Sequence, residues 1–199
     1  MYFFVVYKNR KKSMRERIVK AVVALATLAI VGVLCIYLSS CTQRDKWNEE
    51  QRREAREMLR EWREIAYLNA LSEAEFEVFS AEVTNLLESR WPSYVEFIEM
   101  PMVGDSVEVV VVATIVKDIK ANAHNMRYMF PYPTLVSAGI LPEGLTPHQQ
   151  KEYYMCLANS VDNVFGSVQS FVWGAINSSL DDMAIAYMLR DCAVPFWEK

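Results

Sequence analysis

Few residues in this chain combine the types and spacing that catalysis or metal binding requires. The histidines His124 and His148 form no zinc or iron ligand pattern, and the chain contains no GxSxG, GxGxxG or GxxxxGK[ST] sequence. Glu96 and Glu99 are carboxylates of the kind that cleave glycans, but no neighbouring motif positions them around a substrate. The sequence therefore predicts no catalytic residue, no metal ligand and no cofactor, which favours a protein that is not an enzyme.

Two cysteines in the second half of the chain suit a structural bond. Cys156 and Cys192 lie in segments with helical periodicity, and in an exported protein they could form a disulfide between two helices. Their apolar neighbours are equally typical of buried free cysteines, so both interpretations stay open. Phe196 and Trp197 follow the expected last helix and must either fold back onto the protein or contact a partner.

The amino-terminal part of the chain has the charge and hydropathy of an export segment. Residues 1–40 contain seven Lys or Arg and one Glu, and an uncharged apolar run of 18 residues spans positions 21–38. This length lies between that of a cleaved signal and that of a membrane-spanning helix. The basic flank keeps the amino terminus in the cytoplasm in either case. Residues 1–40 are therefore predicted to be a signal peptide or a signal anchor.

The apolar run closes with Leu38, Ser39, Ser40 and Cys41. This stretch resembles the lipobox of bacterial lipoproteins, in which an aliphatic residue and two small residues precede a cysteine. The resemblance implies a diacylglycerol on the thiol of Cys41 and cleavage of the peptide bond before it. It covers the chain from about residue 14 to Cys41, and Met14 as the true start would give a compact signal.

The same resemblance places the protein in the bacterial cell envelope, anchored by lipid with its domain outside the cytoplasm. Thr42, rather than an aspartate, follows the cysteine, which slightly favours the outer membrane where two membranes exist. Several acyl chains hold a protein durably, because each buried methylene contributes about 0.8 kcal/mol. In the alternative interpretation, the apolar helix is never cleaved and itself anchors the chain.

The remaining residues have the size and composition of one acidic, helical domain. Residues 41–199 carry 14 basic and 24 acidic side chains, a net charge of −10 that argues against binding to nucleic acid. No glycine or proline occurs between Gly32 and Pro92, which favours helix. Residues 41–54 are predicted to form a charged helical spacer, because apolar positions at helical spacing begin near residue 55. Residues 55–199 are predicted to form a single helical domain.

Capping signals mark several helices in this domain. Ser72 with Glu75 and Thr146 with Gln149 match capping boxes, which predict a helix start at each site. The proline-rich segment 131–147 predicts a turn-rich crossover with one short helical turn. The fold class is expected to be an all-α bundle of five or six helices. The expected longer helices after the spacer cover residues 72–90, 107–119, 147–176 with a break near 159–162, and the segment after Ser178 or Ser179.

The segment 94–116 permits a second interpretation. The β-branched run from Val107 to Val112 suits a strand that could form a hairpin with the residues before it, and this would give an α+β fold. Asp105 and Ser106, however, are good helix caps, and apolar residues recur every fourth position after them. We therefore expect a buried central helix.

These features predict a membrane-tethered envelope lipoprotein with a non-catalytic helical domain that binds another envelope protein or has a structural role. Two other classes stay open, a cell-envelope hydrolase that uses carboxylates near the crossover and a module that binds an apolar ligand. Turnover of glycan by the purified protein would favour the hydrolase. A co-purified lipid would favour the ligand-binding module.

The substitution Cys41→Ala tests the anchor. We expect the wild-type chain to gain the mass of acyl chains and to incorporate a labelled fatty acid, whereas the variant gains neither because it lacks the thiol. Intact mass and metabolic labelling provide the measurement. A wild-type protein that has the mass of the uncleaved chain and carries no label would instead identify an uncleaved signal anchor.

Overall fold

The computed structural model describes residues 47–198. The predicted signal or anchor at 1–40 and the lipid site Cys41 lie outside the described residues. The described part contains nine α-helices, two 3₁₀ helices and no strand. The all-α prediction is therefore confirmed, and the alternative hairpin over 94–116 is wrong, because that segment forms helices.

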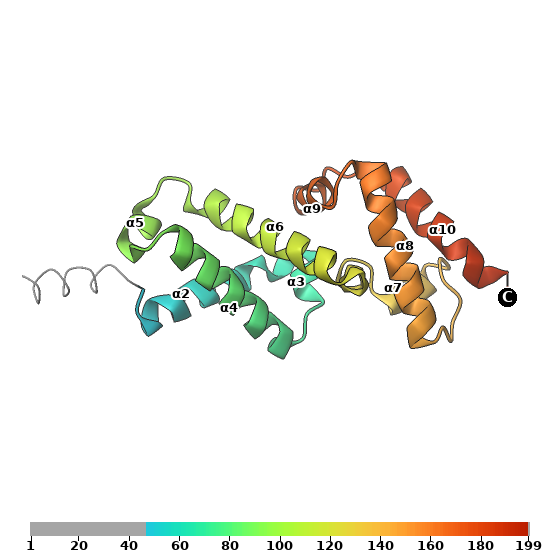
Figure 1. The fold of residues 1–199 in the computed structure, drawn as a ribbon, viewed down its shortest axis with the longest axis horizontal. Coiled ribbons are helices and arrows are strands. Elements are labelled where there is room, and N and C mark those ends of the chain that lie inside the picture. Colours follow the sequence, from blue (N-terminus) through green and yellow to red (C-terminus); the bar gives the residue numbers. More distant parts are fainter. Residues whose placement is uncertain (1–46, 199) are drawn as a thin grey trace, which may run out of the picture. The chain divides into compact units, whose positions relative to one another are not determined.

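The helices follow one another through short connections (Figure 1). Six of the α-helices have nine or more residues, in agreement with the five or six expected. Helix α4 packs against α6, α6 against α9, and α8 against α10. In chain order the elements are α2 (Glu49–Arg60), η1 (Glu61–Glu64), α3 (Ala66–Asn69), α4 (Glu73–Arg90), α5 (Tyr94–Glu99), α6 (Val103–Ala121), η2 (Ala123–Tyr128), α7 (Tyr132–Ser137), α8 (Pro147–Phe165), α9 (Val168–Ile176) and α10 (Asp182–Trp197).

The predicted capping boxes are present. At the start of α4 the hydroxyl of Ser72 accepts a hydrogen bond from the amide N–H of Glu75 at 3.3 Å, and the Glu75 carboxylate accepts one from the amide of Ser72 at 2.9 Å. Thr146 and Gln149 form the same pair at the start of α8. Each box satisfies amides that have no partner within the helix, which fixes where the helix begins.

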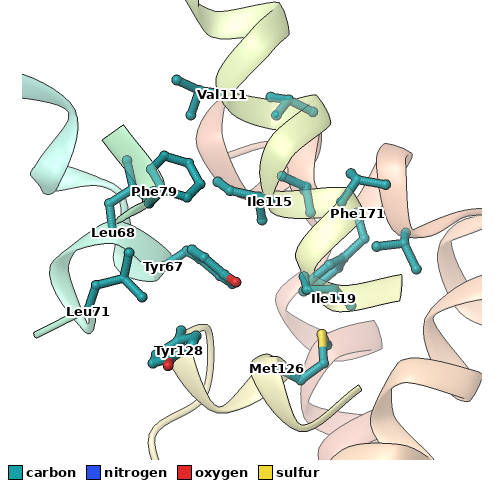
Figure 2. Close-up of a cluster of buried hydrophobic side chains, with 14 of the residues drawn as sticks. Tyr67, Leu68, Leu71, Phe79, Val111, Ile115, Ile119, Met126, Tyr128 and Phe171 are labelled. Carbon is teal, nitrogen blue, oxygen red and sulfur yellow. The ribbon is translucent and has the colours of Figure 1, made fainter. Parts of the chain in front are cut away.

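Helix α6 carries the centre of the core. Its Val111, Ile115 and Ile119 are fully buried, and they lie in one cluster with side chains from α3, α4, η2 and α9 (Figure 2). Tyr67 of α3 packs edge-on to Tyr128 of η2, with 5.2 Å between the ring centroids. Truncating a buried side chain of this size to alanine typically costs about 2–5 kcal/mol, so this cluster strongly determines the stability of the domain.

Helix α6 begins before its predicted caps. Met102 adopts a left-handed conformation with φ of 62°, and its carbonyl accepts hydrogen bonds from the amides of Asp105 at 3.1 Å and Ser106 at 3.4 Å. Asp105 and Ser106 therefore lie inside the first turn. A carboxylate in that turn still interacts favourably with the helix dipole, which explains why the sequence resembled a cap.

The break in the predicted helix 147–176 lies at Gly166 and Ser167 rather than near 159–162. Gly166 has φ of 78°, a conformation that glycine adopts without a steric penalty, and α8 ends there. The hydroxyl of Ser167 then caps α9 by accepting a hydrogen bond from the amide of Ser170 at 3.0 Å. The last helix, α10, begins at Asp182, directly after its N-cap Asp181.

The compact unit begins at Trp47, inside the predicted spacer 41–54. Trp47 is buried, and its ring packs against Phe97 of α5 with 5.0 Å between the centroids. Arg52 of α2 donates two hydrogen bonds, of 2.9 and 3.0 Å, to Glu88 of α4. A buried ring and an ion pair therefore bind the described part of the predicted spacer to the domain.

A disulfide joins Cys156 of α8 to Cys192 of α10, with 5.7 Å between the two Cα atoms. Cys192 is buried, and the hydroxyl of Ser160 lies 3.5 Å from its sulfur. Of the two interpretations that the sequence left open, the structure contains the bonded one. The bond fixes α10 to α8 at a point where the two helices already pack together.

Removing this bond by the double substitution Cys156→Ala and Cys192→Ala should lower the free energy of unfolding by about 2–4 kcal/mol, because the unfolded chain is no longer restricted. Urea unfolding of the wild-type protein with and without reductant provides the measurement. The double variant is the control, since reductant should not change its stability. Alkylation of Cys156 and Cys192 in denatured, unreduced protein, located by peptide mass, would contradict the bond.

Candidate functional site

The two histidines occupy different settings. His124 lies in η2 with its ring edge-on to Tyr154, 5.3 Å between centroids, and its Nδ1 atom is buried without a hydrogen-bond partner. Burial, followed by the positive charges of Arg127 and Lys151, lowers the pKa of His124. His148 is exposed at the start of α8. Within residues 47–198, no group of three or more His, Cys, Asp or Glu side chains could hold a metal ion.

Glu96 and Glu99, the carboxylates considered from the sequence, and the adjacent acidic pair Asp181 and Asp182 have exposed or structural positions. Glu96 and Glu99 are both exposed on the short helix α5. Asp181 is the N-cap of α10, where its Oδ1 atom accepts a hydrogen bond from the amide of Met183 at 2.9 Å. Asp182 follows in the first turn, where its negative charge interacts favourably with the helix dipole. Capping accounts for the acidic pair, and the two glutamates are in contact with solvent.

A polar network connects α4 with η2. The Tyr128 hydroxyl donates to the Glu75 carboxylate at 2.5 Å, and the Arg127 guanidinium donates to the same hydroxyl and lies 3.6 Å from Glu75. The hydrogen bond from Tyr128, followed by those from Ser72, lowers the pKa of Glu75 to about 2. Burial raises the pKa of Tyr128 to about 12. At neutral pH the carboxylate is therefore charged and the phenol is neutral.

This network borders a hollow of about 390 Å³ lined by α4, α6 and η2, at which Glu75, Glu82 and Asp118 lie. Lys117 pairs with Glu82 at 2.5 Å, and the Tyr67 hydroxyl donates to Asp118 at 3.4 Å. Burial, followed by the charge of Glu82, raises the pKa of Asp118. Each of these carboxylates already has a partner from the protein itself, so the hollow is best explained as part of the junction between η2 and the helices.

Helix α10 has one buried face and one exposed face. Met188, Leu189, Cys192 and Ala193 are buried against the domain. The opposite side presents large side chains to solvent. These are Met183, Tyr187, Val194 and Trp197, with exposed fractions of 79%, 71%, 49% and 56%. We call this side of α10, together with Arg190 and Asp191, the outer face.

Two shallow hollows run along the outer face. One, of about 490 Å³, is lined by Met183, Ala186, Tyr187, Arg190, Asp191 and Val194. The other, of about 310 Å³, lies next to it and is bordered by Trp197 and by Gly139 and Ile140 of the turn after α7. Both hollows include Arg190 and Val194, so they form one continuous surface.

Contacts on the buried side hold the outer face in place. The disulfide ties Cys192 to α8, and the Tyr153 hydroxyl of α8 donates to the carbonyl of Leu189 at 3.2 Å. Phe196 is half-buried, with its ring edge-on to Tyr153 and 6.1 Å between centroids. These contacts lie in the second half of α10, between Leu189 and Phe196, and there they hold the outer face on a fixed support.

The aromatic pair near the carboxyl end lies in the last turn of α10, not beyond the helix as predicted. Helical geometry separates the two side chains, so Phe196 faces the domain and Trp197 faces outward. The Trp197 indole N–H donates to the carbonyl of Ile140 at 2.8 Å. Of the two predicted partner contacts, Phe196 folds back onto the bundle and Trp197 remains available for a partner.

Sequence reasoning missed the outer-face residues before Trp197. A signal for them exists, because Met183, Tyr187, Arg190, Val194 and Trp197 follow one another at spacings of four, three, four and three. That pattern is typical of a helix seam that packs against another helix. It extends over barely two heptads and was therefore not separable from the pattern of a helix that faces its own core.

None of the helices in residues 47–198 has both the length and the hydrophobicity that crossing a membrane requires. Comparison of the chain with protein-family models, with curated proteins and with solved structures finds no match in any of the three. The function is therefore inferred from the residues of this chain.

The substitution Tyr128→Phe should lower the free energy of unfolding at pH 7 by about 1 kcal/mol, the value of a hydrogen bond to a partly solvated charge. The folded pKa of Glu75, about 2, lies below its ordinary value of 4.5. The stabilisation is thus fully present above pH 4.5 and is lost as the pH falls through about 2. Urea unfolding between pH 2 and 7 should show that the difference in free energy of unfolding between the wild-type protein and the variant becomes smaller in acid.

Tyr132→Phe is the matched control for this experiment. The Tyr132 hydroxyl donates to the carbonyl of Pro142 at 2.9 Å and accepts from the amide of Leu145 at 3.0 Å. These backbone groups do not titrate, so the loss in free energy of unfolding that Tyr132→Phe causes should not depend on pH. A loss in Tyr128→Phe that is also independent of pH would contradict the coupling to Glu75.

Proposed function

We propose that this chain is a membrane-tethered envelope protein whose helical domain binds another protein through the outer face of α10. The observation that carries this proposal is the row of large exposed side chains at Met183, Tyr187, Val194 and Trp197. Apolar surface in contact with water is unfavourable, and burying it contributes about 25 cal/mol for each Å². A contiguous row of this kind is typical of a protein interaction site.

The composition of the outer face favours a protein partner. Tyr187, Trp197 and Arg190 are of the residue types that contribute most of the binding energy in protein interfaces. The hollows are shallow and extend along the helix, whereas a small ligand is usually held in a concave pocket that covers most of its surface. A flat surface with aromatic anchors suits a partner that is itself an extended surface.

The charges around the outer face argue against an anionic lipid surface as its partner. Asp182, Asp191 and Glu198 lie along α10 or at its end, with Arg190 as the basic residue between them. Binding to anionic lipids relies on clusters of Lys or Arg. The domain as a whole is also acidic, with a net charge of −10 over residues 41–199.

The tether in this proposal is a lipid on Cys41, or an uncleaved amino-terminal helix in the alternative. It is supported by the basic flank, the apolar run and the lipobox-like sequence. The proposed location is the bacterial cell envelope, outside the cytoplasm, with the outer membrane slightly favoured where two membranes exist. A domain tethered in this way meets partners that share the same membrane at high effective concentration.

Photo-cross-linking in cells tests the docking surface. A p-benzoylphenylalanine in place of Tyr187 should give one discrete adduct after irradiation, because the side chain lies in the middle of the outer face. The same group in place of Val95, which is 54% exposed on α5, is the control and should give none. Gel mobility and mass spectrometry measure the adducts.

A second substitution makes the result specific. Val194→Glu places a charge in the outer face without touching the buried side, so it should reduce the Tyr187 adduct by at least about tenfold, as expected for an unpaired charge in an interface. Adducts of equal yield at positions 187 and 95, or no adduct at either position, would contradict the proposed function.

A further inference from the structure

The outer face of α10 contains charges of both signs at its centre. Arg190 and Asp191 lie midway between Met183 and Trp197, and both are exposed. Within residues 47–198, neither side chain takes part in an ion pair or hydrogen bond. A surface with one positive and one negative charge at its middle can complement a second copy of itself.

We propose that the partner of the outer face is a second copy of this chain, packed antiparallel about a twofold axis near Arg190 and Asp191. This inference rests on the proposed function and names the partner of the same surface. A twofold pair uses one patch twice, so the patch must be complementary to itself in shape and in charge.

The spacing of the apolar residues fits such a pair. The row Met183, Tyr187, Arg190, Val194 and Trp197 has the four-three repeat of a helix seam and is centred on position 190. In an antiparallel pair, the Met183 and Tyr187 end of one copy meets the Val194 and Trp197 end of the other. Both ends carry one aromatic and one aliphatic side chain, so they are similar in size.

Charge selects the antiparallel arrangement. In a parallel pair, equal positions of the two helices face each other, which would place Arg190 against Arg190 of the second copy. An antiparallel pair whose twofold axis passes between positions 190 and 191 places Arg190 of each copy opposite Asp191 of the other, with no net charge at the axis. Each arginine then lies near a carboxylate of the other copy, and like charges need not face each other.

The size of the face implies a weak pair in solution. Each aromatic side chain contributes roughly 150–250 Å² when fully buried. With two aromatics, one methionine and one valine on each copy, the interface belongs to the small class of transient contacts. The acidity of the domain opposes association, but salt screens this repulsion beyond about 8 Å at physiological ionic strength. Tethering to one membrane offsets the weakness by raising the effective concentration.

Charge exchange in the full-length chain tests this pairing. Two differently tagged copies are expressed together, each with p-benzoylphenylalanine at position 187, and irradiated in cells. The wild-type pair should give an adduct of twice the single-chain mass that carries both tags. Arg190→Asp on both copies, or Asp191→Arg on both copies, places four like charges at the axis and should reduce this adduct about tenfold or more.

Mixing the two variants is the decisive measurement. One copy with Arg190→Asp and the other with Asp191→Arg places two acidic side chains opposite two basic ones, so the adduct should return to within about twofold of the wild-type yield. Arg53→Asp, an equal change of charge at an exposed position of α2, is the control and should leave the yield unchanged. Far-UV circular dichroism and a urea-unfolding midpoint equal to that of the wild-type protein check that every variant keeps its fold.

The outcomes separate this inference from the proposed function. A Tyr187 adduct with a protein of different mass would overturn pairing of the chain with itself while supporting the docking surface. No adduct at all would overturn both. An adduct of two copies that persists in both single variants, or that fails to return on mixing, would overturn the arrangement about Arg190 and Asp191.

Discussion

Burial of helix α6 on several sides is the constraint on which the rest of the domain depends. Its run of valines and isoleucines has a weak intrinsic preference for helix, because β-branched side chains lose rotamer freedom there. The segment is helical because α4 and α5 pack against it, α9 packs against it as well, and η2 follows it directly. With Val111 and Ile115 fully covered, the energy of the core outweighs the local preference for strand. The first and second halves of the domain are thereby joined through one helix.

Features fixed by neighbouring residues were predictable from the sequence, and features fixed by distant contacts were not. The capping boxes at Ser72 and Thr146 are local, since each is formed by residues three apart, and both helix starts were predicted correctly. The start of α6 depends on the left-handed conformation of Met102, which no residue type signals. Likewise, Trp47 is buried by a helix more than forty residues later, so the charged segment around it resembled a solvated spacer.

The same distinction applies to the outer face. The sequence predicted a last helix, and it identified Cys192 and Phe196 as residues that could face the domain. Which apolar side of the helix faces inward is decided by α8, through the disulfide and the contact of Phe196 with Tyr153. An apolar stripe is equally compatible with a core and with a partner surface, so Tyr187 and Val194 could be assigned to the surface after the packing was known.

Helix α10 divides its residues between two tasks that do not share side chains. Met188, Leu189, Cys192 and Ala193 hold the helix to the domain, whereas Tyr187, Arg190, Asp191 and Val194 contribute little to the core. Mutations on the outer side can therefore accumulate without loss of the fold, since surface substitutions away from buried features usually change stability by less than about 0.5 kcal/mol. In evolutionary terms, the identity of the partner can change while the scaffold stays the same, and a new specificity can arise through very few substitutions on one helix.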